Sequence, residues 1–281
     1  MTDRMEKIGH SIIQHGEENN RVYLMKLDKQ DAGTIISHME RLAEDNGYEK
    51  IFCKVPEWAK NVFIRHHYEE RASIPRFYQG KETVCFMTKF LHPERMHLTG
   101  EDRKTIQTNI RLARDRAGSA AEPVIPSGHD ILKLTESHIP ALAALYQLVY
   151  ASYPFPITEP AYLRQTMMSG HVDYFGVMSG RELIAAASAE KDVPSANAEM
   201  TDFATIPEQR GRGLATALLV SMEEDMKKQG MATLYTIARA MSAGMNITFA
   251  RCGYLFAGTL INNTQIFGRI ESMNVWYKNI I

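Results

Sequence analysis

The chain has 281 residues, and its 32 Lys and Arg almost balance its 33 Asp and Glu, which leaves a net charge of −1. This balance argues against a global electrostatic field that would recruit nucleic acid or an anionic membrane surface. No apolar run is long enough to span a membrane and the N-terminus lacks a hydrophobic signal segment, so we expect a cytoplasmic protein. The three cysteines are far apart and the histidines have no ligand spacing, so no metal site is expected.

A chain of this length suits two domains, and the first is expected over residues 1–92. Its first twenty residues are polar and predict irregular structure. Alternation and capping signals then predict a strand at Arg21–Leu27, a helix at Asp31–Asn46, a strand at Lys50–Val55, a helix at Pro56–His67, and two strands within Glu69–Leu91 joined at Gln79-Gly80-Lys81.

Residues 93–130 read as a helix followed by a linker. Thr99 and Asp102 have the spacing of a capping pair for a helix that ends near Ala117. The Gly-, Ser- and Pro-rich segment 118–128 then predicts the domain boundary.

The second domain is expected over residues 131–281. The expected elements are a strand at Ile131–Leu134, helices at 136–150 and 160–170, strands at 172–178, 182–190 and 197–206, a helix at 214–229, a strand at 234–238, a helix at 242–251, and two strands joined near Asn262-Asn263. The order of elements in 47–91 parallels that in 230–277.

The segment Arg210-Gly211-Arg212-Gly213-Leu214-Ala215 joins a strand to the start of an apolar-faced helix. The two glycines free the backbone to point consecutive N–H groups at an anion, beside the positive end of the helix. A P-loop would need Gly-Lys-Ser/Thr here, and a dinucleotide fingerprint would need Gly or Ala at Thr216 in an N-terminal unit.

This segment resembles the acetyl-CoA loop, Arg/Gln-x-x-Gly-x-Gly/Ala, of the GCN5-related N-acetyltransferase (GNAT) superfamily. Asn246 and the run Phe249-Ala-Arg-Cys-Gly-Tyr254 follow at the family's usual distance. The resemblance implies an α/β (α+β) fold whose C-terminal sheet is mixed and mostly antiparallel. It also implies that acetyl-CoA, with no metal, is bound by Ala204, Thr205, Ile206, Arg210, Gly211, Arg212, Gly213, Leu214, Ala215, Asn246 and Phe249. The N-terminal domain is then either a degenerate acetyltransferase-like unit, since it has no such loop, or an unrelated small α/β domain.

Three segments narrow the resemblance to the β-lysine N6-acetyltransferases. They are Tyr-Pro-Phe-Pro-Ile157, the strand Ala198–Thr205 entering the glycine loop, and Gly47–Pro56. This family makes the compatible solute Nε-acetyl-β-lysine, so the resemblance implies β-lysine as the acceptor. Alternatives are another small amine, a protein lysine, or a non-catalytic acetyl-CoA-binding regulator. The sequence is compatible with a homodimer and does not fix the oligomeric state.

The reaction needs a base, because an alkylammonium with a pKa of ~10.4 must lose a proton to become nucleophilic. Glu199, eleven residues before Arg210, matches the general-base glutamate of one branch of the superfamily, and Asp202 is the alternative. The family commonly places an acidic Tyr where Phe249 stands here, so Tyr254, Tyr235 or solvent would have to protonate the leaving thiolate.

The acceptor is expected beside the loop between the first two helices of the second domain. Tyr150, Tyr153 and Phe155 lie in this loop, where members of the superfamily bind substrate, and a packed Pro-rich corner is the other interpretation. Arg164 on the second helix is the candidate partner for an acceptor carboxylate.

Overall fold

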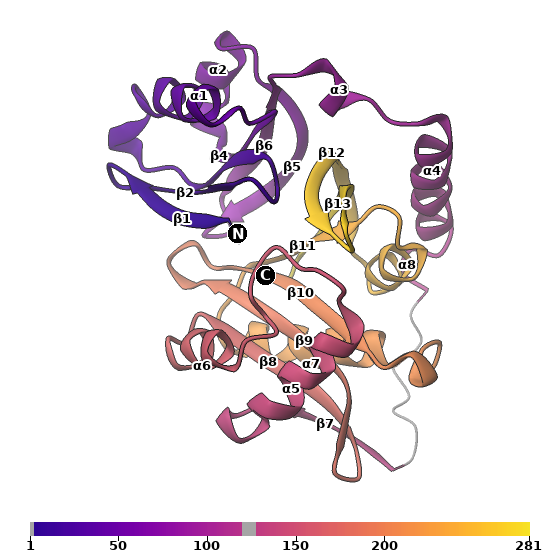
Figure 1. Cartoon of the computed structure of the whole chain (residues 1–281). Coiled ribbons are helices and arrows are strands. Elements are labelled where there is room, and N and C mark those ends of the chain that lie inside the picture. Colours follow the sequence, from indigo (N-terminus) through magenta and orange to yellow (C-terminus); the bar gives the residue numbers. More distant parts are fainter. Residues whose placement is uncertain (1–2, 120–127) are drawn as a thin grey trace.

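The computed structural model describes residues 3–119 and 128–281. Their strands form one 13-stranded sheet in the order β1-β2-β3-β4-β6-β5-β12-β13-β11-β10-β9-β8-β7 (Figure 1). Helices cover the sheet, so the expected mixed α/β fold is confirmed. The first half of the chain supplies one end of this sheet and the second half supplies the other, and we refer to residues 3–92 and 128–281 as the N-terminal and C-terminal halves.

The N-terminal half contains one hairpin that the sequence did not predict. Its elements are β1 (Arg4–Ile8), β2 (Ser11–Gly16), β3 (Arg21–Lys26), η1 (Lys29–Asp31), α1 (Ile35–Asn46), β4 (Lys50–Pro56), α2 (Glu57–Arg65), β5 (Glu69–Tyr78) and β6 (Glu82–Phe90). The expectation of irregular structure before residue 20 was wrong, because β1 and β2 pair there. Gln14 and His15 are buried polar residues of β2, and their polarity hid the strand in the sequence.

The connection between the halves consists of α3 (Pro93–Met96) and α4 (Gly100–Arg114). Thr99 Oγ1 accepts a hydrogen bond of 3.0 Å from the Asp102 N–H, which confirms the expected cap. Figure 1 shows α4 beside α8 (Ala243–Arg251) of the C-terminal half, and Asn109 of α4 donates to the Ala240 carbonyl at 2.9 Å. Most of the expected linker, residues 120–127, lies outside the described residues.

The C-terminal half follows the predicted order of elements. It contains β7 (His129–Lys133), η2 (Glu136–His138), α5 (Ile139–Val149), α6 (Pro160–Met168), β8 (Val172–Ser179), β9 (Glu182–Asp192), η3 (Val193–Ser195), β10 (Asn197–Thr205), η4 (Pro207–Gln209), α7 (Leu214–Lys228), β11 (Thr233–Arg239), α8, β12 (Leu255–Ile266) and β13 (Arg269–Asn279). The predicted apolar face of α7 is buried in the core, at Leu214, Leu218, Leu219, Met222 and Met226.

The turn between the last two strands is not at Asn262-Asn263, as the sequence suggested. Both residues lie inside β12, at a register shift between Leu260 and Thr264, and Asn262 has a φ of 41°. The Asn262 amide donates to the carbonyls of Arg95 and His97, so long-range bonds hold these asparagines in the strand. The turn is formed instead by Phe267 and Gly268, whose φ angles are 53° and 79°.

The two halves have the same strand arrangement. β1-β2-β3-β4-β6-β5 of the N-terminal half corresponds to β8-β9-β10-β11-β13-β12 of the C-terminal half. In each half one parallel pair is joined through a helix, β3 to β4 through α1 and β10 to β11 through α7. The halves meet where β5 pairs with β12 at Ala72 and Gly258, and a Cβ at Gly258 would lie 2.0 Å from the Arg71 carbonyl oxygen.

Candidate acetyl-transfer site

The parallel strands β10 and β11 separate near the middle of the C-terminal half. Their ladder contains three pairs and ends at Glu199 and Tyr235. β10 nevertheless continues to Thr205 and β11 to Arg239. The facing backbone edges beyond Glu199 are therefore not paired with each other, and Ala204 and Thr205 of β10 pair with β9 on the other side.

The loop after β10 presents a row of free backbone donors. Gly211 and Gly213 have φ angles of 78° and 79°, in the region that disfavours other residues, and a Cβ on either would meet nothing within 4 Å. No acceptor among the described residues takes a hydrogen bond from the N–H groups of 211–216. Arg210 and Arg212 are exposed beside them. These donors at a helix N-terminus fit a pyrophosphate.

A pocket of about 520 Å³ lies between the two halves of the chain. Its C-terminal side includes Glu190, Glu199 and Tyr235, and its N-terminal side includes Gln14, Arg21, Tyr23 and Lys54. This volume is in the range of small-molecule sites, about 300–1,000 Å³. The pocket therefore joins the end of the β10–β11 ladder to the face of the N-terminal half.

Two carboxylates face each other across neighbouring strands in this pocket. Glu199 of β10 is directly opposite Glu190 of β9. Burial raises the pKa of Glu190 well above its usual range, and the charges of Asp202 and Glu199 add to this effect. Burial also raises the pKa of Glu199, while Lys54 and a hydrogen bond with Tyr235 oppose the rise. Such a pair favours cationic ligands and holds protons more tightly than free carboxyls do.

Asp202 lies at a bulge in β10 and is held by hydroxyl groups. The ladder with β9 shifts between Thr201 and Ala204, and Asp202 has a φ of 54°. Its carboxylate accepts hydrogen bonds from Ser188 Oγ, at 2.5 Å, and from the Tyr153 hydroxyl. Asp202 is 5% exposed and is not among the pocket-lining residues. Ser188 is two residues before Glu190 on β9, so its hydrogen bond holds the Asp202 carboxylate on the face of the sheet that carries Glu190.

Lys54 brings a positive charge from the N-terminal half to these carboxylates. Its Nζ donates to the Tyr235 hydroxyl at 3.4 Å. Burial lowers the pKa of Lys54, but the charges of Tyr23 and Glu199 outweigh this effect, and the net change is upward. The charge of Lys54 is thus already compensated by the acidic side of the pocket.

Comparison with known proteins assigns the site to a family. The sequence profile of the Acetyltransferase (GNAT) family matches residues 142–254. The β-lysine N6-acetyltransferase of Methanococcus maripaludis is 34% identical over 277 residues, which cover 98% of each chain. The chain belongs to the GNAT acetyltransferase family.

Two further proteins are similar to this chain. The β-lysine N6-acetyltransferase of Methanosarcina mazei is 30% identical over 265 residues, covering 87% of this chain and 96% of that one. An N-acetyltransferase structure from Staphylococcus aureus Mu50 is 19% identical and covers 55% of this chain and all of that one, with a TM-score of 0.48. Enzymes of the GNAT family use acetyl-CoA, and the free donors of the 211–216 loop fit its pyrophosphate.

The structure separates the predicted acceptor residues of this GNAT acetyltransferase. Tyr153 and Phe155 line the pocket. Tyr150 packs behind them, and its hydroxyl donates to the Phe203 carbonyl at 2.8 Å. Arg164 is exposed on α6, 3.8 Å from Glu136, and does not line the pocket, so its predicted contact with the acceptor is not supported by its position.

Three residues predicted for the cofactor or the leaving group are buried in the core. The Asn246 side chain bonds the carbonyls of Arg239 and Ser242 and accepts from Asn274 and Trp276, so it braces α8 against the sheet. Phe249 is 1% exposed, with its ring 5.0 Å from that of Tyr254. Tyr254 is also 1% exposed and lies beside Glu223, outside the residues that line the pocket. None of the three lines the pocket between the halves, and their roles stay predictions.

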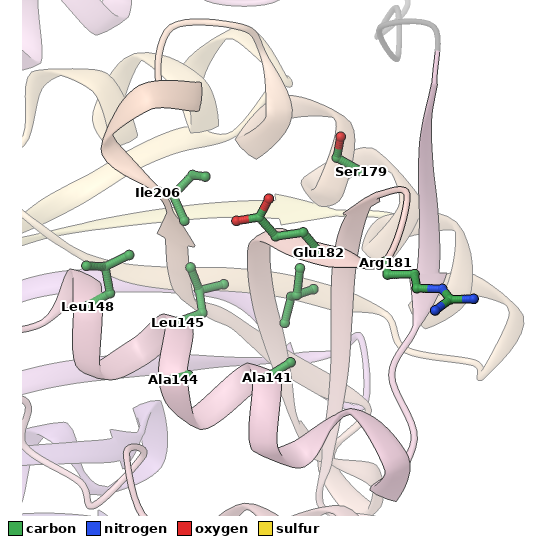
Figure 2. Close-up of a pocket in the computed structure, with 9 residues that line it drawn as sticks. Ala141, Ala144, Leu145, Leu148, Ser179, Arg181, Glu182 and Ile206 are labelled. Atoms are coloured by element: carbon green, nitrogen blue, oxygen red, sulfur yellow. The ribbon is translucent and has the colours of Figure 1, made fainter.

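A second hollow of about 620 Å³ lies between α5 and the β8–β9 turn (Figure 2). Its wall is mainly Ala and Leu side chains of α5, with Ile206 on the opposite side and Glu182 and Arg181 at the turn (Figure 2). It contains no facing pair of carboxylates like that of Glu190 and Glu199. The pocket between the halves therefore fits acetyl transfer to an amine better.

Two general features of the described residues concern other classes of function. No helix in this part of the chain is both long and apolar enough to cross a membrane.

His10, Asp28 and Asp31 lie close enough to share a metal ion, but Asp31 already accepts hydrogen bonds from the N–H groups of His10 and Ser11 and from Ser11 Oγ. The absence of a metal in the reaction remains a prediction.

Sequence reasoning missed Glu190 and every pocket residue of the N-terminal half. The predicted strand at 182–190 ended on Glu190, and pairing it with the strand that carries Glu199 could have placed the two acids together. Gln14 had no such signal, because its strand was not predicted. Arg21 and Lys54 lay in predicted strands, but the sequence contained no sign that this face meets the other half.

Proposed function

We propose that the protein transfers the acetyl group of acetyl-CoA to the N6 amine of β-lysine. The observation that carries the proposal is the Glu190–Glu199 pair at the point where β10 and β11 separate, in a pocket of small-molecule size. The acidic side of the pocket, formed by Glu190 and Glu199, suits an ammonium group of the acceptor. Similarity to two β-lysine N6-acetyltransferases over nearly the whole chain supports the choice of acceptor.

Acetyl-CoA is held, in this proposal, by the C-terminal half alone. The N–H groups of Gly211–Thr216 and the guanidinium groups of Arg210 and Arg212 bind the pyrophosphate. The unpaired edge of β10 over Ala204–Ile206 hydrogen-bonds the pantetheine chain. A backbone N–H of the same edge stabilises the oxyanion that forms from the thioester carbonyl.

Glu199 acts as the general base, directly or through water. It accepts a proton from the N6 ammonium, and the amine then attacks the thioester carbonyl, forming the amide as the C–S bond breaks and the thiolate leaves. Asp202 serves as a positioning residue, because its carboxylate is bound by the hydroxyls of Ser188 and Tyr153. Tyr235 lines the pocket, so it is better placed than the buried Tyr254 to protonate the thiolate.

The N-terminal half is, in our interpretation, a degenerate acetyltransferase-like unit, with its limit near residue 92 and the catalytic domain over 131–281. The identical strand order supports this interpretation. The free N–H row of the 211–216 loop has no described counterpart after β3, where Asp28 and Asp31 take part in hydrogen bonds.

The test is analysis of the product by tandem mass spectrometry. Purified full-length protein is incubated with acetyl-CoA and β-lysine, with α-lysine as a parallel acceptor. We expect β-lysine to gain one acetyl group on N6, with only modest discrimination against α-lysine. An acetyl group on the 3-amine, or no acetylated β-lysine at all, would refute the proposal.

A further inference from the structure

The N-terminal face of the pocket contains a buried cation with no acid to pair with. Arg21 of β3 is 4% exposed. One of its terminal nitrogens donates to the Asn263 carbonyl and to Thr264 Oγ1, while Nε has no hydrogen-bond partner among the described residues. No ion pair joins it to a carboxylate of the described residues, although buried charges are normally paired, and the charge of Asp3 acts on it only from a longer distance.

Gln14 of β2 adds a second unsatisfied group to this face. It is 1% exposed, and both its Nε2 and Oε1 lack a partner in the described structure. Gln14 is directly opposite Tyr23 on β3, and Arg21 is two residues before Tyr23, so the three side chains share one face. A buried amide with neither atom bonded costs stability unless a ligand completes it.

Most of the other cations near this face are already engaged. Lys54 contacts Tyr235 and is compensated by Glu199. Lys50 does not line the pocket, and its Nζ donates to the Ile261 carbonyl and to Asn263 Oδ1. Arg95 pairs with Glu49 at 3.1 Å. Lys191 also lines the pocket and pairs with Asp173, and Lys26 lines it as an exposed side chain. Arg21 is thus the buried positive group that remains for a ligand.

The rings beside Arg21 shape the space around its guanidinium. Its Cζ lies 5.2 Å from the centroid of the Tyr23 ring and 5.6 Å from that of Phe52. Burial lowers the pKa of Arg21 to about 10, so it stays charged at neutral pH. A planar guanidinium with a free edge, next to an amide, is suited to a carboxylate.

We infer that Arg21 and Gln14 form a carboxylate site, through which the N-terminal half binds the acceptor while the C-terminal half performs the chemistry. The inference rests on the proposed function, and it adds the group that recognises the amino acid. The acceptor lies across the pocket, with its terminal amine at Glu199 and its carboxylate at Arg21. An acceptor that has a carboxylate is therefore bound more tightly than a diamine that lacks one.

The test compares β-lysine with the diamine that remains when its carboxyl group is removed. Steady-state kinetics are measured for the wild type, for Arg21→Met, and for the matched control Arg41→Met on the exposed side of α1. Loss of a hydrogen-bonded charge pair is worth about 1.5–3 kcal/mol, so kcat/KM for β-lysine should fall roughly 10- to 100-fold in Arg21→Met. The value for the diamine, and both values in Arg41→Met, should stay unchanged.

Gln14→Leu covers the case in which Arg21→Met does not fold. The Gln14 side chain makes no hydrogen bond within the described structure, so the substitution should leave the melting temperature equal or higher. It should raise KM for β-lysine and leave KM for the diamine unchanged. The carboxylate site alone would be overturned if both variants kept the wild-type ratio of kcat/KM for β-lysine to kcat/KM for the diamine. If Arg21→Met does not fold, the same result in Gln14→Leu would be enough. Failure of the wild type to acetylate β-lysine would overturn this site and the proposed function together.

Discussion

The two halves share a strand order but differ at the same position of their sheets. In the C-terminal half the third pair of the parallel ladder joins Glu199 to Tyr235, and Glu190 is opposite Glu199. In the N-terminal half the third pair joins Tyr23 to Phe52, and Gln14 is opposite Tyr23. The row Glu-Glu-Tyr thus corresponds to the row Gln-Tyr-Phe, and both rows line one pocket.

The loops that follow β10 and β3 also differ: the first can bind an anion, and the second contains acidic residues. The C-terminal loop has two glycines with positive φ and two exposed arginines. The N-terminal loop has Asp28 and Asp31, and hydrogen bonds lower the pKa of Asp31, with Ser11 as the largest cause. The backbone arrangement alone therefore does not define the site: its acids and its phosphate-binding donors belong to one half only.

The largest effect on activity is expected from replacing Glu199, which has no acidic counterpart in the N-terminal half. Glu199→Gln should keep acetyl-CoA binding and lose roughly 10²–10⁴-fold in kcat at neutral pH, as is usual for a general base. Because burial raises the pKa of Glu199, wild-type activity should fall as pH drops through that raised pKa. The loss in the variant should shrink toward high pH, where the amine deprotonates without help.

The control for this prediction is Asp202→Asn, assayed over the same pH range. Asp202 is held by Ser188 and Tyr153, so its substitution should alter positioning and affect kcat without removing the acid limb of the profile. If Asp202→Asn abolished the pH dependence and Glu199→Gln did not, the roles of the two acids would be exchanged.

A smaller effect is expected at the strand pair that joins the halves. Gly258→Ala places a Cβ against the Arg71 carbonyl, and overpacking of this kind costs about 1–3 kcal/mol in free energy of unfolding. Urea denaturation should detect this loss, and KM for β-lysine should rise because the pocket lies between the halves. Gly244→Ala in α8, whose Cβ would meet nothing within 4 Å, is the matched control and should be neutral or stabilising.

The sequence predicted most reliably those features that need a particular type of residue, such as glycine at a positive φ or apolar residues on one face of a helix. The glycines of the 210–215 loop and the apolar face of α7 predicted the loop and helix correctly. Glu199, which the resemblance implied as the base from its spacing to that loop, lines the pocket, and its role stays a prediction. The site formed by Gln14 and Arg21 could not be predicted in the same way. Buried polar residues weaken the alternation that identifies a strand, and their function depends on a surface from the other half of the chain.

The claim that the C-terminal half alone binds acetyl-CoA is tested most directly by substituting one glycine in each of two loops, Gly213 after β10 and Gly33 after β3. Acetyl-CoA is titrated calorimetrically into folded Gly213→Val and Gly33→Val, since Gly33 lies in the corresponding N-terminal loop, without a positive φ and with open space at its Cβ. Gly213→Val should abolish measurable binding, because a side chain there blocks the phosphates and disfavours the backbone conformation. Gly33→Val should bind as the wild type does. Wild-type affinity in Gly213→Val, or lost affinity in Gly33→Val, would contradict the account.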